Sequence, residues 1–592
     1  MLEEVNSALR QSRRVVIDVE TTGLDWRTKK ICGYVLTFGP APEDSYYIPV
    51  RHESGPNFDP TMVRNMLVSA QTESRHWVGH NIAFDLGFLH AEGITLNGTF
   101  EDTMINAALL DEFASSFSLE SCADAAGVQG KKGQAMYEHI AATFGLPVHR
   151  NRMGEYWKLP ADDAMAVEYA TGDGTTTWQL CEYQRPRIER DELVDVHKVE
   201  CDLIPVLNRM TMRGIKVDEE RLQKFQWVLR AMVEKAMTDI GEDLNTRSSA
   251  QIRKYLEKNG CTNWPTTDKG NPSFAEEWLK THEPGRRIIN VRKAQNMLNS
   301  FVEPMLERHL YKGRVHATFN QLKSDSFGTV TGRLSSSNPN LQQVPKRNKG
   351  LGILFRSIFV PDRGMLWGSA DYSQAEPRLL AHYSDCKVLV DGYNQKPSVD
   401  AHTAVAVAAN IDRDSGKRLN QALLTGAGTR KVAEMLGGPM DEAMKIVDKY
   451  FEAMPEIRTL QARASKVMKG RGFVRSILGR RSRLEARGYE YKAVNRLLQC
   501  SNADMIKVSM VKIDALCRSA GGIDMLNNVH DSIDFQYTAD KEEVYREALR
   551  IMCDFPQIKV PLEVEEDSGP DWAWASYGED DWRKVMTEKG MI

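Results

Sequence analysis

The sequence lacks a long apolar run, a paired cysteine motif and a large surplus of charge of either sign. No stretch of its 592 residues could span a bilayer, and residues 1–14 lack the apolar core of a signal peptide. Its nine cysteines show no CxxC pair and no metal-ligand spacing, as is typical of proteins in a reducing cytosol. These absences argue against a membrane protein and a disulfide framework. We expect a soluble protein of the cytoplasm.

The charge and the length set further bounds. A net charge of −4 argues against a uniformly basic protein that wraps nucleic acid. It does not exclude a local basic groove, because the field at a site depends on how charge is distributed. A chain of 592 residues is too long for one hydrophobic core, so we expect about two to four domains.

The pattern of the chain changes along its length. The first 190 or so residues alternate short β-like runs, such as Arg14–Ile17 and Tyr34–Phe38, with helical patterns. Residues 195–310 are helical and amphipathic, and helices dominate again over residues 401–518. The pattern predicts a multidomain α/β protein.

Acidic residues recur at spaced positions in the N-terminal part. Asp18 and Glu20 lie on one face of a predicted strand, because side chains alternate with period two. Two carboxylates on one face repel each other unless solvent or a cation separates them, so both a solvated strand face and a metal site are open. Asp85 adds an acid in an apolar setting, and Tyr169 and Asp173, four residues apart, share one face of a predicted helix.

These four acids and the tyrosine, in this order and spacing, resemble the DEDD exonuclease superfamily in its tyrosine-containing branch. The resemblance covers roughly residues 14–180 and implies a ribonuclease H-like 3′→5′ exonuclease domain. It also implies that two divalent ions are held by Asp18, Glu20, Asp85 and Asp173. Tyr169 would help to orient the attacking water, with one ion generating hydroxide and the other stabilising the leaving 3′ oxygen.

A second set of residues suggests phosphoryl transfer further along the chain. Asp371 follows the apolar run Met365–Trp367, and Asp531 lies in another apolar, turn-like context. Each alone is better explained as a cap or turn residue, but together they would form a two-metal site if their strands are neighbours in the fold. Between them, Arg413 and Lys417 lie four apart on one helical face. Such a face is commonly just solvated, but cations here could offset the charge of a triphosphate.

From about residue 195 to 580 the chain resembles DNA polymerase family A. The matching segments are Thr331–Ser336, Asn338–Gln342, Gly472–Val474, Gly479–Arg481, Ala503–Asp504, Val560–Leu562 and Gly569–Trp572, together with the positions named above. They follow one another in the family's order. The resemblance implies a right-hand polymerase with palm, fingers and thumb.

The resemblance implies roles for the matching positions. The metal ligands would be Asp371, Asp531 and the backbone carbonyl of Tyr372. The nucleotide contacts would be Arg413, Lys417, Gln421, Thr425, Glu376 and His402, with Lys417 also acting as an acid toward pyrophosphate and Glu376 crowding the sugar 2′ position. The DNA contacts would be Arg333, Asn495, Gln499, His530, Arg480 and Arg481. The wider basic run of Arg471, Arg475, Arg480, Arg481 and Arg483 would supply phosphate contacts.

The implied organisation is an exonuclease domain over residues 1–190 and a polymerase domain over 191–592. Within the latter we expect the thumb at about 205–320, the palm at about 321–400 and 500–592, and the fingers at about 401–499. The implied cofactor is Mg²⁺, two ions per active site, with Mn²⁺ as a possible substitute. The implied partners are primer-template DNA and deoxynucleoside triphosphates. We expect a monomeric phage replication enzyme with no insertion for a processivity factor.

Four positions depart from the family pattern. Gln421 and Thr425 replace aromatic residues of the fingers helix, Ser532 replaces the acid after Asp531, and Pro377 replaces an apolar residue after Glu376. Loss of an aromatic contact removes roughly 1 kcal/mol of favourable packing. We therefore expect altered sugar or base selection, which could serve a modified base such as 2-aminoadenine.

Other functions compete with this one. The departures suggest an active exonuclease joined to an impaired or specialised polymerase module. A primer-template binding protein with vestigial metal sites is opposed by the acids retained in both sites. A single-subunit RNA polymerase would lack this exonuclease, and Glu376 opposes ribonucleotides.

Overall fold

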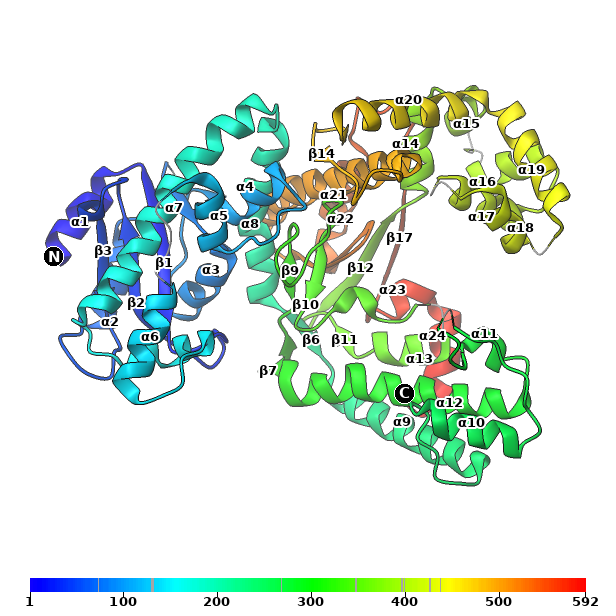
Figure 1. Cartoon of the computed structure of the whole chain (residues 1–592), viewed down its shortest axis with the longest axis horizontal. Helices are drawn as coiled ribbons and strands as arrows, with labels where there is room; N and C mark the ends of the chain where they lie inside the picture. Colours follow the sequence, from blue (N-terminus) through cyan, green and yellow to red (C-terminus); the bar gives the residue numbers. More distant parts are fainter. Residues whose placement is uncertain are drawn as a thin grey trace.

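The computed structural model describes residues 1–72, 74–128, 133–267, 269–346, 349–395, 398, 400–424, 427–436 and 438–592. It has an N-terminal part at the left of Figure 1 and a larger part at the right. The predicted α/β character is confirmed in both parts. Within these ranges, none of the helices combines the length and the hydropathy that a membrane-spanning segment requires.

A mixed sheet forms the centre of the N-terminal part. Its strands lie in the order β3-β2-β1-β4-β5, with β1 antiparallel to β2 and parallel to β4. The strands are β1 (Arg14–Thr21), β2 (Ile31–Thr37), β3 (Ser45–Pro49), β4 (His76–Gly79) and β5 (Thr99–Asp102). The helices are α1 (Leu2–Gln11), α2 (Pro60–Ser69), α3 (Ile82–Ala91), α4 (Thr103–Leu110), α5 (Leu119–Ala126), α6 (Gly133–Phe144) and α7 (Ala164–Arg190).

Strand β1 shows the predicted alternation. Val15, Ile17 and Val19 are buried in the apolar core of this part. Asp18 and Glu20 are only half-buried and lie on the opposite face of the strand. The sheet therefore has a polar face that can form a site.

A second, antiparallel sheet lies in the larger part. Its order is β15-β16-β12-β17, with β15 (Ile523–Val529), β16 (Ser532–Thr538), β12 (Met365–Tyr372) and β17 (Val564–Gly569). Helices α21 (Ala493–Ala520) and α22 (Glu542–Cys553) contact each other and its strands, and α14 (Ala375–Ser384) contacts α21. Buried apolar residues of these elements belong to one large core, which continues into other helices of this part.

Two groups of helices extend from this sheet, one at the upper right and one at the lower right of Figure 1. The upper group comprises α15 (Lys387–Asn394), α16 (Ala401–Ala409), α17 (Arg413–Leu424), α18 (Thr429–Leu436), α19 (Met440–Ala453) and α20 (Pro455–Arg471). The lower group comprises α9 (Glu219–Ile240), α10 (Ser249–Lys258), α11 (Glu276–Leu279), α12 (Glu283–Met297), α13 (Lys349–Arg356), α23 (Trp574–Tyr577) and α24 (Glu579–Glu588).

Short strands complete the larger part. They are β6 (Ile215–Val217), β7 (Leu310–Tyr311), β8 (Arg314–Val315), β9 (Thr318–Asn320), β10 (Ser335–Ser337), β11 (Phe359–Val360), β13 (Val474–Arg475) and β14 (Arg481–Ser482). Strands β13 and β14 form a small antiparallel hairpin, which interrupts the helices predicted over residues 401–518.

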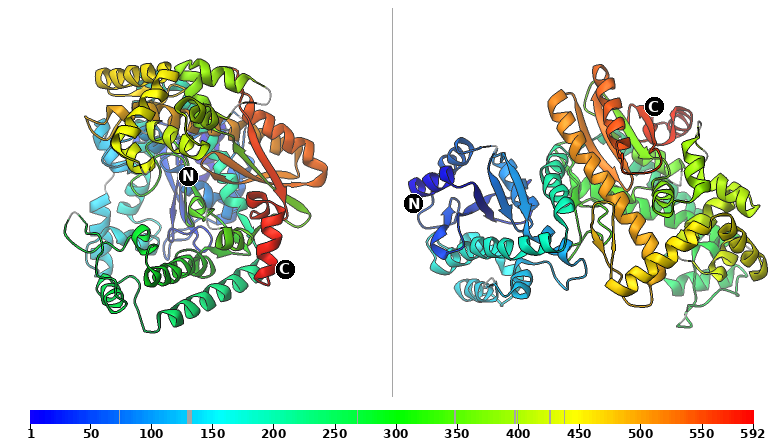
Figure 2. Two further views of the ribbon diagram at one scale, coloured as in Figure 1. Left: turned by 90° about the vertical axis from the view of Figure 1, so that its right-hand side faces the viewer. Right: turned by 90° about the horizontal axis from the view of Figure 1, so that it is seen from above.

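Helix α8 (Val194–Arg213) joins the two parts, which lie along the long axis of the molecule in Figure 1 and in the right-hand view of Figure 2. It contacts α3 and β5 on one side and α21 on the other. Leu193, Val196, Ile204 and Leu322 belong to the same apolar core as the strands of the N-terminal sheet. The two parts therefore share a core across their junction.

Candidate active sites

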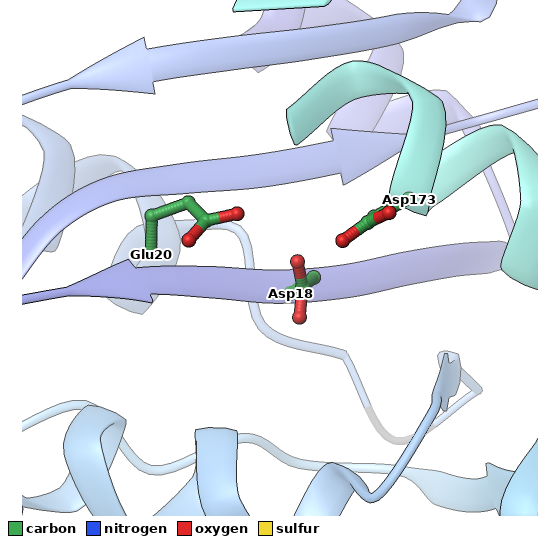
Figure 3. A group of neighbouring side chains, drawn as sticks. All are labelled: Asp18, Glu20 and Asp173. Atoms are coloured by element: carbon green, nitrogen blue, oxygen red, sulfur yellow. The ribbon is translucent and has the colours of Figure 1, made fainter. Parts of the chain in front are cut away.

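Three acids of the N-terminal part form a cluster that could hold a metal ion. Asp18 and Glu20 come from β1 and Asp173 comes from α7, and all three carboxylates face one another in Figure 3. One oxygen of each lies within 4.8 Å of the others. Clustered carboxylate oxygens are the ligands that Mg²⁺ and other hard divalent cations prefer, so these residues fit such an ion.

Asp85 lies beside this cluster rather than in it. Its side chain is 2% exposed on α3, and its Oδ1 accepts a hydrogen bond of 3.0 Å from the backbone N–H of Val19. Burial, and next the charge of Asp18, hold the pKa of the Asp85 carboxyl well above its usual range. This hydrogen bond joins Asp85 to β1 at Val19, the residue between Asp18 and Glu20.

Asp102 is a buried acid that sequence reasoning missed. Its carboxylate accepts hydrogen bonds from the backbone N–H groups of Asn81 (2.9 Å), Ile82 (3.0 Å) and Met104 (2.8 Å). It therefore caps α4 and holds the start of α3, the helix that carries Asp85. The sequence signal that could have identified Asp102 is an Asp that ends a strand and directly precedes a helix.

Tyr169 lies on α7 one turn before Asp173, as the spacing predicted. Its side chain is 5% exposed, and its ring lies 6.0 Å from that of Tyr156 between centroids. The hydroxyl of Tyr156 donates to the carbonyl of Ala166, 2.8 Å away on α7. The ring of Tyr169 is thus held by packing beside the acid cluster.

Asp371 and Asp531, distant in sequence, lie on neighbouring strands. In the pairing of β12 with β16, Asp371 is opposite Ser532. Asp531 lies in the tight turn between β15 and β16, and its carbonyl accepts a 3.3 Å hydrogen bond from the N–H of Tyr372. Burial raises the pKa of Asp371 to about 6; Lys346 opposes this rise, and Asp531 adds to it.

Asp531 has two donors near one oxygen. The Nδ2 of Asn502 lies 2.6 Å from its Oδ1, and the Nη2 of Arg333 lies 3.7 Å from the same atom. Arg333 also donates to Oε1 of Glu376 at 2.6 Å. Burial raises the pKa of Glu376, with Arg333 opposing. The structure therefore brings Asp531, Glu376 and Arg333 together.

The side chain of Tyr372 points into the core of the polymerase part. Its side chain is 5% exposed, and its hydroxyl donates to the carbonyl of Met552 at 2.5 Å and lies 3.2 Å from the hydroxyl of Ser509. The ring of Tyr372 is therefore part of the apolar core.

The cations predicted on α17 lie next to α16. Arg413 and Lys417 are exposed, and Nε of Arg413 lies 2.6 Å from Oδ2 of Asp400, the cap of α16. His402 is 8% exposed on α16. Burial lowers the pKa of His402, Asp400 opposes this, and the charges of Lys417 and Arg413 add to it. These residues form one predominantly cationic group.

The remaining nucleotide positions are only partly described. Gln421 continues α17, but the description of the chain does not extend to its side chain. Thr425 lies outside the described residues.

Comparison with known proteins identifies the chain. The sequence model of DNA polymerase family A matches residues 216–574, more than half of the chain. The chain belongs to DNA polymerase family A. A model described as 3′-5′ exonuclease matches residues 1–189 of this polymerase. The predicted family and its union of polymerase and exonuclease are confirmed.

Relatives match this polymerase over nearly its full length. DNA polymerase DpoZ of Salmonella phage PMBT28 is 29% identical, over 95% of this chain and 97% of that protein. DNA polymerase DpoZ of Acinetobacter phage SH-Ab 15497 is 28% identical with the same coverage. The fold is similar to that of the POL domain of Pol1 from M. smegmatis, solved with DNA primer-template and dNTP. The TM-score is 0.82, with 22% identity over 97% of this chain and 99% of that one.

Arg480 is predicted to contact DNA, but it lies in the interior of this polymerase, where it pairs with carboxylates. The residue is 4% exposed, and its guanidinium donates from Nε to Asp504 Oδ1 at 2.8 Å and pairs with Glu200. Two carboxylates thus compensate its buried charge, so it is not available to phosphate in this structure. We do not retain Arg480 among the proposed DNA contacts.

The other predicted DNA contacts are accessible to varying degrees. Asn495 and Gln499 are half-buried on α21, and His530 is exposed at the β15–β16 turn. The side chain of Arg481 is 17% exposed, and its guanidinium pairs with Asp191 at 2.9 Å.

Proposed function

We propose that this polymerase adds deoxynucleotides to the 3′-OH of a template-bound primer by two-metal phosphoryl transfer and proofreads with its 3′→5′ exonuclease. The observation that carries the proposal is the position of Asp371 beside the Asp531 turn on neighbouring strands of a family A polymerase. The pair lies in the larger part and the cluster of Asp18, Glu20 and Asp173 in the other, which supports two separate sites.

In the polymerase site, Asp371, Asp531 and the carbonyl of Tyr372 would hold the divalent ions. Bound cations would supply a more acidic primer hydroxyl and offset the charge of the phosphates. Arg413 and Lys417 bind the triphosphate, and Lys417 gives a proton to the leaving pyrophosphate. Their exposure on one face of α17 supports this role.

Glu376 limits the space at the sugar 2′ position, so that deoxynucleotides are preferred. Its contact with Arg333 supports this assignment, because the 2.6 Å hydrogen bond fixes the carboxylate near Asp531. His402 is a phosphate contact beside Arg413. The predicted change in sugar or base selection at Gln421 and Thr425 stays a prediction.

In the exonuclease site, Asp18, Glu20, Asp85 and Asp173 would hold the ions, Mg²⁺ or Mn²⁺. Tyr169 orients the water that attacks the terminal phosphodiester. The buried ring of Tyr169 on the helix that carries Asp173 supports this geometry. Removal of a mispaired 3′ nucleotide is the resulting proofreading reaction.

The partner that we propose is primer-template DNA, with which the POL domain of M. smegmatis Pol1 was solved. The contacts are Arg333, Asn495, Gln499, His530 and Arg481. We propose an exonuclease domain over residues 1–190, a polymerase domain over 191–592 and action as a monomer. The phage relatives support work in the cytoplasm of an infected bacterial host. An impaired polymerase module is not favoured, because both proposed metal-binding acids of the palm, Asp371 and Asp531, are present.

Primer extension and primer degradation on one template test the proposal. With Mg²⁺, Asp371→Asn is expected to lose extension by at least about 1000-fold and to keep degradation, since it removes a metal ligand of one site only. Asp18→Ala is expected to show the opposite pattern. A wild-type protein that degrades the primer but extends it with no nucleotide set would establish the impaired-polymerase alternative.

A further inference from the structure

Asn502 is a buried amide in contact with a proposed metal ligand. It lies on α21, is 1% exposed, and its Nδ2 is 2.6 Å from Oδ1 of Asp531. Its own Oδ1 is buried, and the described residues provide no hydrogen-bond partner for that oxygen. One end of the amide is therefore engaged with Asp531 and the other is unsatisfied.

The direction of this hydrogen bond follows from chemistry. The amide NH₂ group of Asn502 donates and a carboxylate oxygen of Asp531 accepts. Asn502 follows Gln499 by three residues and Asn495 by seven, so all three lie along one face of α21. That face is directed at the turn that carries Asp531.

Other nearby groups hold the carboxylate less closely. Arg333 Nη2 lies 3.7 Å from the same oxygen while donating to Glu376 at 2.6 Å. Ser532, next in the chain, directs its hydroxyl to the carbonyl of Val529 at 3.0 Å. The contact from Asn502 is therefore the shorter of the two described contacts to Asp531 Oδ1.

We propose that Asn502 is a positioning residue that fixes the carboxylate of Asp531 for divalent-ion binding. This rests on the proposed function of Asp531 as a metal ligand. By holding Oδ1, Asn502 restricts the side chain to one orientation before the ion arrives. Partners that orient metal ligands typically change metal affinity or activity about 10–100-fold when removed.

Asn527 provides a matched control on β15, the strand that leads into the turn of Asp531. It is buried, its Nδ2 donates to Oδ2 of Asp534 at 3.2 Å, and its Oδ1 also has no partner among the described residues. It thus reproduces the asparagine–aspartate contact without an assigned metal ligand. Asn527→Leu measures what the loss of such a contact does by itself.

The test compares Asn502→Leu with Asn527→Leu in the full-length protein. The first readout is the Mg²⁺ concentration for half-maximal primer extension. The second is Mn²⁺ binding followed by EPR in an Asp18→Ala/Asp173→Ala background, with a dideoxy-terminated primer-template and the matching dNTP. We expect Asn502→Leu to weaken both about 10–100-fold. We expect Asn527→Leu to leave both at the wild-type value.

Folding is checked by primer degradation in the exonuclease-competent background, which Asn502→Leu should preserve. If it does not, Asn502→Ala replaces it. Wild-type metal requirement and Mn²⁺ affinity in the Asn502 variant would overturn the inference and leave the proposed function intact. A wild-type protein that does not extend primers would overturn the proposed function, while the Mn²⁺ titration still decides whether Asn502 supports the ion site.

Discussion

Glu101 is a buried carboxylate that joins several elements of the exonuclease part. It is 1% exposed on β5, and its oxygens lie 2.5 Å from Arg185 Nη2, 3.0 Å from His76 Nε2 and 3.6 Å from His197 Nε2. Burial alone would raise its pKa, but hydrogen bonds from His197, His76 and Arg185 outweigh burial and hold the pKa below its usual range. The group therefore remains ionised inside the protein.

Glu101→Gln is expected to lower the local stability of β5 and α7 by about 3 kcal/mol at pH 7, because partners of a buried charge lose their counter-ion. A depressed folded pKa gives stability that is complete above the unfolded value of about 4.3 and is lost as pH falls below it. The difference between wild type and variant should therefore shrink below about pH 4. Amide hydrogen exchange of β5 measures this difference in local stability between wild type and variant.

The control is Glu182→Gln. Glu182 lies on the same helix as Arg185, its side chain is 56% exposed, and it pairs with Arg14. Exposed pairs contribute about 0–1 kcal/mol, so little change is expected at either pH. An equal effect of the two variants would contradict the assignment of the stability to the buried network.

The hairpin of β13 and β14 fastens the polymerase part to the exonuclease part. Arg483 pairs with Glu112, which follows α4, and its Nη2 donates to the carbonyl of Leu110 at 2.9 Å. Arg475 lies 2.5 Å from Glu192 and Arg481 lies 2.9 Å from Asp191, and these two acids directly follow α7 at the border between the proposed domains. A basic run that the sequence assigned to phosphate contacts is thus largely paired with acids of the same chain.

Glu112→Gln should loosen this hairpin, because Glu112 is 6% exposed and also accepts from the backbone N–H of Arg483 at 2.6 Å. Trypsin cleavage after Arg487, in the exposed turn beyond the hairpin, is expected to be about tenfold faster, equivalent to about 1.4 kcal/mol. Glu192→Gln removes an acid that is 76% exposed and should have little effect. Unchanged cleavage in Glu112→Gln would show that the hairpin does not depend on this pair.

For the whole molecule, the apolar core crosses the border between the proposed domains. Val196 and Ile204 on α8, and Leu322 further along the chain, are buried in the core of the N-terminal sheet. Burial of each such side chain contributes about 1.5–3 kcal/mol. A cut near residue 190 would divide the proposed activities but would also expose this surface.

We therefore expect a fragment of residues 191–592 to bind the dye ANS and to associate in solution, since its exposed patch is apolar. Replacing Val196 and Ile204 by Gln in that fragment should reduce ANS binding, because both would face solvent. Light scattering and ANS fluorescence measure the two effects. A monomeric fragment that binds no dye would mean that α8 folds back on its own part.

Much of the candidate chemistry was predictable from local periodicity. The period of two in β1 placed Asp18 and Glu20 on one face, and the four-residue spacing in α7 placed Tyr169 one turn from Asp173. The order of motifs along the chain predicted the family, which the match over residues 216–574 confirms.

Which residues share a face of an element could be predicted from the sequence, because that depends on the backbone geometry within the element. What each face contacts depends on how distant elements pack: Asp531 contacts Asn502, and Arg480 contacts Glu200 and Asp504 in the interior. The charge of a buried arginine such as Arg480 must be offset by some partner, and the sequence does not reveal whether that partner is phosphate, water or a buried carboxylate. The packing of distant elements decides which of these the guanidinium contacts.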